Sequence, residues 1–228
     1  MKILAIDTSD QVLSVALETD AGIFLSETDA GMKHSELLME SVDALCKTAG
    51  LNQGELEYVA CMKGPGSFTG LRIGFSAAKG LCLALGIPLL TAPTLDCAAY
   101  PHSIWPGMVL PVIDAKKGCF FTALYRGGRQ LTGYMDAAPD LIAQSLNSAS
   151  SFTEEPLLLT GSGAYLFKPL LEKLFPVGRI RLDPEYRKGR AMELLNIIKK
   201  DILLKEDELH SGPMYLRKSD AEINQKLP

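Results

Sequence analysis

Histidine is scarce in this 228-residue chain, and the three histidines, His34, His102 and His210, stand far apart. Proteins bind zinc and other transition metals mainly through clustered histidine and cysteine side chains. The five cysteines are at least 15 positions apart and lie among apolar residues. They indicate small core residues of a reducing compartment rather than a disulfide framework. We therefore expect no bound metal and no cofactor, and a cytoplasmic location.

A strong charge of one sign is also lacking, because 23 basic residues face 27 acidic ones and the net charge is −4. Without a basic stripe, the chain alone is not expected to bind nucleic acid strongly. The amino-terminal apolar run Ile3–Ile6 is stopped by Asp7, which argues against a signal peptide. The longest apolar segment, residues 71–85, is interrupted by Arg72 and Lys79, so we expect no membrane span.

Glycine is concentrated in the run Gly64-Pro-Gly-Ser-Phe-Thr-Gly-Leu-Arg-Ile-Gly74, which follows a strand expected over residues 57–62. Such a turn lets the backbone approach another group closely. The hydroxyl of Ser67 or Thr69 can cap the helix that follows, whose free N–H groups would favour an anion. Binding of an anion and tight packing against protein both remain open for this turn.

Known nucleotide and catalytic motifs do not fit the glycine run. No Lys-Ser or Lys-Thr follows its last glycine, as a Walker A motif requires, and its glycine spacing differs from the dinucleotide fingerprint. Ser67 lacks the Gly-x-Ser-x-Gly elbow of a nucleophile, because position 65 is proline. A catalytic role for Ser67 is therefore not expected.

The helix expected over residues 71–85 is apolar on every flank. A helix of this kind is normally buried all round, so a second domain, a second copy or a partner should cover it. Gly70, Gly74 and Ala78 follow at four-residue spacing and would let a neighbouring backbone come close. An ordinary central helix between two layers of one domain is the alternative interpretation.

The pattern of elements occurs twice along the chain. Ala5-Ile6-Asp7 matches Val112-Ile113-Asp114, and the same offset of 107 residues matches parts of the following strands. A duplicated unit of three strands, a helix and further strands indicates a two-lobed α/β fold. We place the boundary in the proline-rich segment 100–107, which gives lobes over residues 1–104 and 105–228. The expected strands cover residues 2–8, 11–19, 23–28, 57–62 and 88–92, and the expected helices cover 35–49, 71–85, 139–146, 164–175 and 190–204.

Two aspartates, Asp7 and Asp114, end the matching strands. Strand ends are common ligand sites in α/β folds, so these carboxylates could belong to a nucleotide cleft together with Gly64, Gly66 and Ser67. Carboxylates at strand ends also cap turns through hydrogen bonds to the backbone. We favour the second interpretation and treat the cleft as vestigial.

Several motifs together resemble one family, the TsaB (YeaZ) family, along essentially the whole chain. They are the start Lys2-Ile-Leu-Ala-Ile-Asp-Thr-Ser9, the glycine run 64–74, Val112-Ile-Asp-Ala115, Thr160-Gly-Ser-Gly163 and Pro213-Met-Tyr-Leu-Arg217. The resemblance implies two RNase-H-like lobes of the actin/Hsp70/sugar-kinase fold. It also implies a part in adding threonylcarbamoyl to N6 of adenosine 37 of tRNA, with the paralogue TsaD as catalyst and the ATPase TsaE as a third component.

The paralogue's metal-binding run His-Leu-Glu-Gly-His corresponds here to Thr94-Leu-Asp-Cys-Ala98, so both ligand histidines are replaced. This difference implies a non-catalytic subunit that docks on TsaD, contacts tRNA only through the complex, and associates with itself when alone. The resemblance places the docking surface on the two long helices of the first lobe. The candidate interface residues are Leu37, Leu38, Ser41, Leu45, Leu71, Arg72, Phe75 and Ala78.

Two other functions stay open at this point. The first is a nucleotide-binding phosphotransferase or ATPase of the same fold, which ATP binding by the isolated chain would reveal. The second is a peptidase, for which the sequence offers neither a Ser–His pair nor a metal site.

Overall fold

A computed structural model describes residues 1–148, 155–175, 178–200 and 202–217. The chain forms two compact units. The first unit combines Met1–Pro101 with Arg187–Pro213, and the second combines His102–Tyr186 with the described residues 214–217. The chain passes from the first unit to the second after Pro101, within the segment where the lobe boundary is expected. However, residues 187–213 pack with the first unit, whereas the expected division at 104/105 assigns them to the second.

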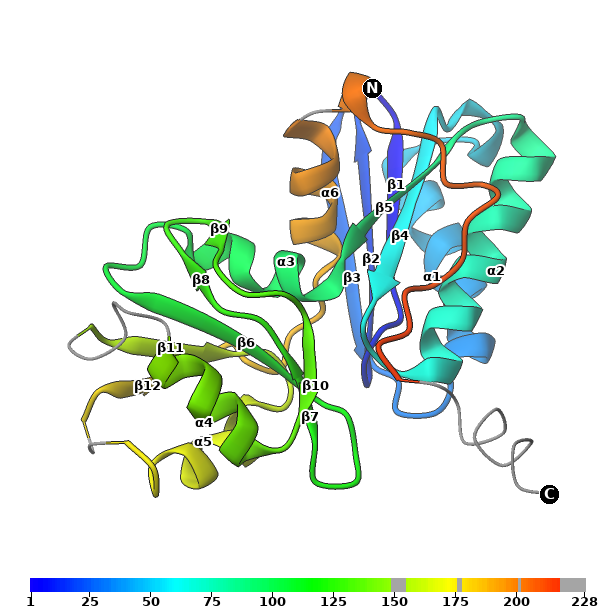
Figure 1. Ribbon diagram of the computed structural model, residues 1–228. Coiled ribbons are helices and arrows are strands. Elements are labelled where there is room, and N and C mark those ends of the chain that lie inside the picture. Colours follow the sequence, from blue (N-terminus) through cyan, green and yellow to red (C-terminus); the bar gives the residue numbers. More distant parts are fainter. Residues whose placement is uncertain (149–154, 176–177, 201, 218–228) are drawn as a thin grey trace, which may run out of the picture. The chain divides into compact units, whose positions relative to one another are not determined.

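The first unit is built on a five-stranded sheet with the order β3-β2-β1-β4-β5 (Figure 1). The strands are β1 (Ile3–Asp7), β2 (Val12–Thr19), β3 (Gly22–Asp29), β4 (Tyr58–Gly64) and β5 (Leu89–Pro93). The first three strands pair antiparallel, while β4 and β5 run parallel to β1. All five strands expected in this part of the sequence are confirmed, with bounds that differ by at most two residues at either end.

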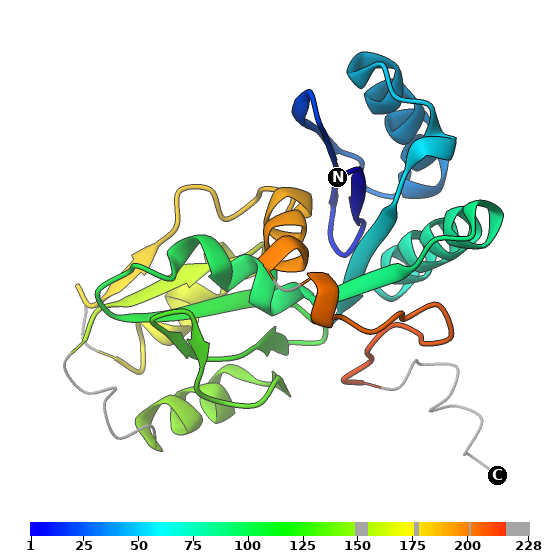
Figure 2. The ribbon, with the colours of Figure 1, turned by 90° about the horizontal axis from the view of Figure 1, so that it is seen from above.

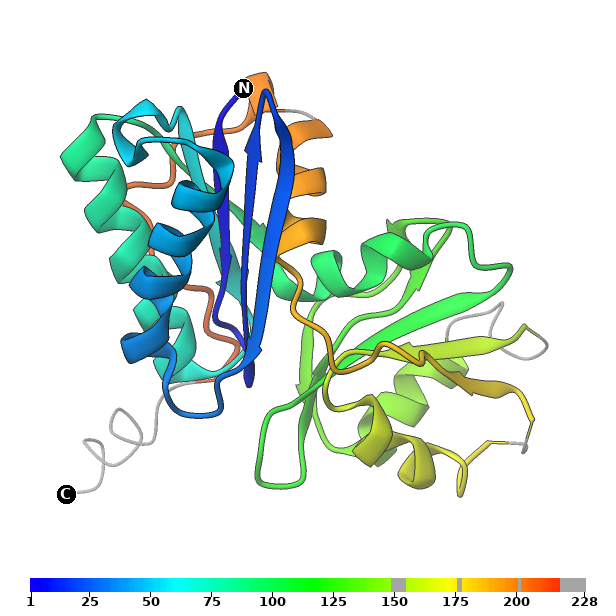
Figure 3. The same cartoon turned by 180° about the vertical axis from the view of Figure 1, so that it is seen from behind.

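Helices cover both faces of this sheet. The period-two alternation of β1 directs Leu4 and Ile6 to one face and Ile3 and Ala5 to the other. Helices α1 (His34–Ala49) and α2 (Phe68–Leu85) pack on the first face, and α6 (Ala191–Lys200) packs on the second. Figure 2 and Figure 3 show α6 across the sheet from α1 and α2.

The edge strand β5 is covered by the chain segment that follows α6. The backbone N–H of Glu208 donates to the oxygen of Leu89 at 2.8 Å, and the N–H of Leu89 donates to Asp207 Oδ1 at 3.0 Å. The Lys63 ammonium pairs with the Glu208 carboxylate, and the Lys79 ammonium donates to the carbonyl oxygen of Ser211. These contacts fix residues 207–211 along the sheet edge and beside α2.

The second unit repeats the strand order of the first. Its main sheet path is β10-β7-β6-β11-β12, in which β7 is antiparallel to β6 and β11 is parallel to it. The strands are β6 (Met108–Asp114), β7 (Phe120–Thr122), β8 (Tyr125–Arg126), β9 (Arg129–Gln130), β10 (Met135–Ala137), β11 (Leu157–Thr160) and β12 (Ile180–Leu182). Helices α4 (Pro139–Ser148) and α5 (Ala164–Leu171) pack on this sheet. The two matching orders are RNase-H-like and confirm the expected fold class.

A buried carboxylate joins the ends of the second unit's strands. Asp183 Oδ2 accepts a hydrogen bond from the Thr160 hydroxyl at 2.7 Å and lies 3.1 Å from His102 Nε2. The backbone N–H of Glu185 donates to Asp183 Oδ1 at 2.9 Å. Burial alone would raise the pKa of Asp183, but the hydrogen bonds from His102 and Thr160 hold it well below its ordinary value.

The sequence argument that Arg72 and Lys79 interrupt the apolar segment is not sufficient, because helix α2 is long and apolar enough to span a bilayer by length and composition. A core helix passes the same test, and in this structure 33% of the helix is buried. Its packing on β4 and β1 accounts for the covered part of its apolar surface.

Candidate functional site

Helix α2 has one ridge buried in its own unit and another ridge exposed. Six residues of the helix are buried: Gly70, Leu71, Gly74, Phe75, Ala78 and Cys82. The exposed ridge consists of Thr69, Arg72, Ser76, Gly80 and Leu83, and the Leu83 side chain is 69% exposed. The chain therefore leaves this ridge of the helix exposed, and its cover by a second copy or a partner stays a prediction.

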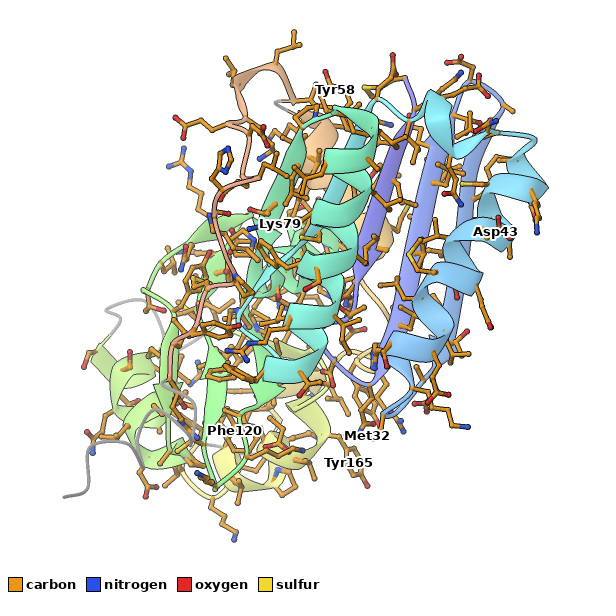
Figure 4. All side chains as sticks on the ribbon, turned by 90° about the vertical axis from the view of Figure 1, so that its right-hand side faces the viewer. Met32, Asp43, Tyr58, Lys79, Phe120 and Tyr165 are labelled. Carbon is orange, nitrogen blue, oxygen red and sulfur yellow. The ribbon has the colours of Figure 1, made fainter. Side chains whose placement is uncertain are left out.

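A groove of about 460 Å³ separates the exposed sides of α1 and α2. Figure 4 looks onto this side of the first unit, with Asp43 labelled on α1 and Lys79 on α2. The groove is lined by Ser35, Leu38 and Met39 on α1, and by Phe68, Thr69, Arg72, Ile73, Ser76 and Ala77 on α2. We call these nine residues, together with Gly80 and Leu83 on the same ridge of α2, the helical face. It is apolar or small in character, and it can accept the ridge of another helix.

Arg72 is the one charged residue among the nine that line the groove. Its guanidinium carbon lies 3.8 Å from the centre of the Phe68 ring, which is a cation–π contact. Both residues stand near the amino end of α2, which begins after Ser67 and has no acidic residue in its first turn. The partial positive charge of that helix end therefore adds to the charge of Arg72.

The structure corrects the surface placement of several predicted interface residues. Leu45, Leu71, Phe75 and Ala78 lie in the unit's own core and are at most 7% exposed. Leu38 is 1% exposed and reaches only the floor of the groove. These apolar side chains face inward because they form the stripe that packs both helices on the sheet.

The other three predicted residues, Leu37, Ser41 and Arg72, are at least partly exposed. Ser35 and Met39 line the groove, and at 100° per residue Leu37 and Ser41 lie on the opposite flank of α1. Of the eight candidates, Arg72 alone lies on the exposed groove surface. The sequence interpretation missed Ser35, Met39, Phe68, Thr69, Ile73, Ser76 and Ala77. The helix side opposite Gly70, Gly74 and Ala78 could have identified Thr69 and Ser76.

The glycine run makes a close intramolecular contact. The Gly66 and Gly70 backbones pass so near the turn after β1 that a Cβ would stand 2.5 Å from Ser9 O and 2.0 Å from Thr8 O, respectively. At Gly74 a Cβ would stand 2.4 Å from Thr8 Oγ1. Gly64 has a φ of 108°, which favours glycine. The glycines of this run therefore make room for the chain's own residues Thr8 and Ser9, which follow β1.

Ser67 is the amino-terminal cap of α2, as predicted. Its hydroxyl oxygen accepts a hydrogen bond from the Gly70 N–H at 3.2 Å. Its own N–H donates to the Ser9 oxygen at 2.7 Å. The hydroxyl thus caps the first turn of α2, and the N–H holds the turn 7–9 against the start of that helix.

Asp7 is 3% exposed, and both of its carboxylate oxygens accept hydrogen bonds. Oδ1 accepts from the Ser9 N–H at 2.9 Å and the Ser9 hydroxyl at 2.6 Å, and Oδ2 accepts from the Arg190 N–H at 2.9 Å. Burial raises the pKa of Asp7, although these hydrogen bonds oppose the rise. The geometry is that of a carboxylate that organises two turns.

Asp114 is organised in the same way within the second unit. Its carboxylate accepts from the Lys116 N–H at 2.8 Å and from the Lys116 ammonium at 2.7 Å. Gly161 and Gly163 pack against the end of β6, because a Cβ would come within 2.6 Å of Val112 O and 2.8 Å of Asp114 N. Each unit therefore ends its central strand in an aspartate against which a glycine turn packs.

A magnesium–nucleotide site does not fit these residues. The Asp7 oxygens already hold the backbone, and among the described residues no group of three histidine, cysteine or acidic side chains could hold a metal ion. The segment that replaces the paralogue's His-Leu-Glu-Gly-His run is helix α3 (Thr94–Ala99). Thr94 and Ala98 stand one turn apart on it and are buried, and neither side chain replaces histidine as a metal ligand.

Comparison with known proteins agrees with the motifs. Residues 24–173 match the sequence model of the family TsaD, tRNA N6-adenosine threonylcarbamoyltransferase. The tRNA threonylcarbamoyladenosine biosynthesis protein TsaB of Bacillus subtilis (strain 168) is 29% identical over 97% of this chain and 96% of its own. TsaB of Buchnera aphidicola subsp. Baizongia pistaciae (strain Bp) is 33% identical over 76% of this chain and 80% of its own. The chain belongs to the TsaB family.

The solved structure of YeaZ from Pseudomonas aeruginosa has the same fold. It superposes with a TM-score of 0.79 over 94% of this chain and 99% of its own, at 23% identity. The TsaB family takes part in tRNA threonylcarbamoyladenosine biosynthesis, and this chain is a member along nearly its full length. The match to the TsaD family agrees with the expected kinship of the two subunits.

Proposed function

We propose that this chain is a non-catalytic subunit that docks on the paralogue TsaD through the helical face. In this role it covers apolar helices of TsaD and holds that enzyme in a competent shape. The ATPase TsaE completes the complex in the cytoplasm, and tRNA is contacted only within the complex. The net charge of −4 supports the last point, because it gives the isolated chain little attraction for phosphates.

The exposed ridge of α2 carries this proposal. A helix with enough apolar residues to cross a membrane leaves Thr69, Ser76, Gly80 and Leu83 exposed to solvent in the isolated chain. Small side chains on this ridge allow a second helix to approach closely, and the groove beside it accepts that helix's larger side chains. Stable interfaces bury about 1,600 Å² in total. This is comparable to the area that two helices of one protein bury against two helices of another.

The residues of the predicted nucleotide cleft support an accessory role rather than catalysis. Asp7, Gly64, Gly66 and Ser67 are committed to the packing of α2 against β1, and Asp114 is committed to its own turn. We therefore propose that they are the remnant of a nucleotide cleft. An active phosphotransferase would instead bind ATP tightly in a Mg²⁺-dependent manner, which equilibrium dialysis of the isolated chain can measure.

Co-expression with TsaD and affinity capture test the proposal. The variant Ser76→Arg places a long charged side chain on the exposed ridge, where the isolated fold tolerates it. The matched control Ser148→Arg makes the same change at an exposed position of α4 in the second unit. We expect the wild type and the control to retain TsaD and Ser76→Arg to lose it. Equal capture by a correctly folded Ser76→Arg chain would overturn the docking proposal.

A further inference from the structure

Strand β3 (Gly22–Asp29) forms an open edge of the first unit's sheet. All eight of its residues pair with β2 on one side, and no other strand in the described part of the chain pairs with it. Just after the strand, the Ala30 N–H donates to the Gln11 oxygen at 3.1 Å, on the β2 side. Because successive residues of an antiparallel strand direct their backbone groups to alternate sides, Ile23 and Leu25 direct their N–H and C=O groups outward.

The amino-terminal half of β3 is also apolar on its less covered face. Phe24 packs on the core cluster that α1 and α2 share, so the side chains of Ile23 and Leu25 point to the opposite face of the sheet. Helix α6 covers that face over the other four strands, and Ile23 and Leu25 remain 45% and 43% exposed. Two aliphatic side chains and outward backbone groups therefore reach solvent at the same place.

Charged side chains protect only the other half of this edge. Natural edge strands avoid association with other strands by charged residues, among other devices. Glu27 and Asp29 stand in the carboxyl half of β3, and Arg187 Nη2 donates to Asp29 Oδ2 at 3.0 Å. The segment 22–26 carries no charge. It is therefore the part of the edge that a further strand can join.

We propose that two copies of this chain associate through segment 22–26 of β3, whose antiparallel pairing joins two five-stranded sheets into one. The register that sets Phe24 opposite Phe24 of the second copy also sets Ile23 of each copy opposite Leu25 of the other. Both residues direct their backbone groups outward, so each such pair exchanges two hydrogen bonds. The four aliphatic side chains then form one cluster on the α6 face of the joined sheet.

The self-complementary pattern of β3 is the argument for a second copy. In the proposed register, the two Glu27 residues stand six residues apart along the strands, which is about 20 Å, so like charges are separated. Because outward residues alternate, the register can shift only by two residues. Such a shift toward the carboxyl end would set Glu27 opposite Ile23 and remove both Ile23–Leu25 pairs.

The contact is small and separate from the helical face. It involves about five residues of each copy, less than the roughly 20 residues a side of a stable interface, so we expect a weak and reversible dimer. The helical face consists of residues of α1 and α2 alone. The inference is therefore independent of the docking function proposed above.

Sedimentation velocity of the full-length chain, from micromolar to near-millimolar concentrations, tests the pairing. Leu25→Lys places a cation in the centre of the contact and should raise the dissociation constant of the dimer at least about tenfold, since it removes both apolar pairs. The control Leu141→Lys makes the same change at an exposed position of α4 and should associate as the wild type does. Ile23→Lys is an independent second variant, and circular dichroism verifies that each chain is folded.

Amide hydrogen exchange of the wild type, followed by NMR, supplies a readout that needs no variant. The Ile23 and Leu25 N–H groups should exchange more slowly as the protein concentration rises, because the second copy accepts their hydrogen bonds. The Phe24 N–H points toward β2 and should exchange at the same rate at every concentration. Exchange at Ile23 and Leu25 that does not depend on concentration would overturn the pairing.

The helical-face variant Ser76→Arg distinguishes the two surfaces. Self-association that survives in Ser76→Arg and is lost in Leu25→Lys would support pairing through β3. If Ser76→Arg abolishes self-association and Leu25→Lys leaves it unchanged, the copies meet on the helical face, and the inference is overturned while docking stands. A folded Leu25→Lys chain should still capture TsaD. Loss of that capture with unchanged self-association would assign the edge to TsaD and overturn the inference.

Discussion

The Thr8 hydroxyl donates a 2.7 Å hydrogen bond to the carbonyl oxygen of Gly70. This bond joins the residue after strand β1 to the first turn of helix α2, and glycine is required for the approach. Helix α2 is thereby fixed directly to the turn that holds Asp7. In the docking function proposed above, the glycine run acts through the position of α2.

Substitution of Gly70 tests this coupling. In Gly70→Ala the new Cβ would stand 2.0 Å from the Thr8 oxygen, so the helix must shift or the strand end must move. We expect a loss of about 2–4 kcal/mol in the free energy of unfolding, measured by urea denaturation, which is typical of a severe steric change in a core. Gly80→Ala is the control, because its Cβ meets nothing within 4 Å, and it should stabilise the helix by about 0.5–1 kcal/mol. Equal stability of both variants would contradict the packing role.

Asp7 should be a structural residue. In Asp7→Asn one carboxylate oxygen becomes an NH₂ group, which cannot accept from Ser9 or Arg190. We expect the free energy of unfolding to fall by about 1–3 kcal/mol, the usual effect of an unsatisfied buried donor. The tRNA-modifying activity of the assembled complex, measured at saturating concentrations of folded variant, should stay unchanged. A large loss of activity in a fully folded and docked variant would assign a chemical role to Asp7.

The stability contributed by Asp183 should depend on pH. Its folded-state pKa lies below the unfolded value of about 3.9, so its contribution is complete above that pH and declines as the pH falls further. Asp183→Asn should therefore unfold at lower urea than the wild type at pH 7, and the gap should narrow between about pH 4 and pH 2. Urea midpoints across this range provide the measurement. A gap independent of pH would show that ionisation of Asp183 is not involved.

Ala78→Glu should act on folding before it acts on docking. Ala78 is completely buried between α2 and the sheet, so a glutamate there would place a charge in the apolar core. We expect a loss of at least about 3 kcal/mol, comparable to the penalty for an uncompensated buried charge. Loss of the native near-ultraviolet circular dichroism in the isolated chain would confirm this expectation. An isolated variant that melts like the wild type would show that Ala78 is less enclosed than the structure indicates.

The fold could be predicted because the local patterns agree with the duplicated architecture. The alternation of side chains in β2 predicted that strand, and Gly50 and Gly86 predicted where α1 and α2 end. The expected bounds of these elements are therefore close to the observed ones. The short strands β8, β9 and β12 were missed, since two or three residues carry no detectable period. The final helix was expected to reach Leu204 but ends at Lys200, while residues 202–204 form a 3-10 turn and residue 201 lies outside the described residues.

The exposed side of α2 was harder to predict than the helix itself. Apolar residues occur all round α2, so hydrophobicity alone could not show that Ala78 faces the sheet and Ser76 faces solvent. The contact of Gly70 and Gly74 with Thr8 decides the rotation of the helix, and that contact spans more than sixty residues of sequence. Similarly, nothing local to Asp7 shows that the Arg190 N–H satisfies it.

Because residues 187–213 return to the first unit, a fragment that stops at Pro101 would not be a self-sufficient protein. Such a fragment would lack α6 and leave Ile3, Ala5 and Ala60 bare on one side of the sheet. A fragment that keeps the whole first unit would instead need a linker from Pro101 to Arg187, so that the helices on both faces of the sheet remain in place.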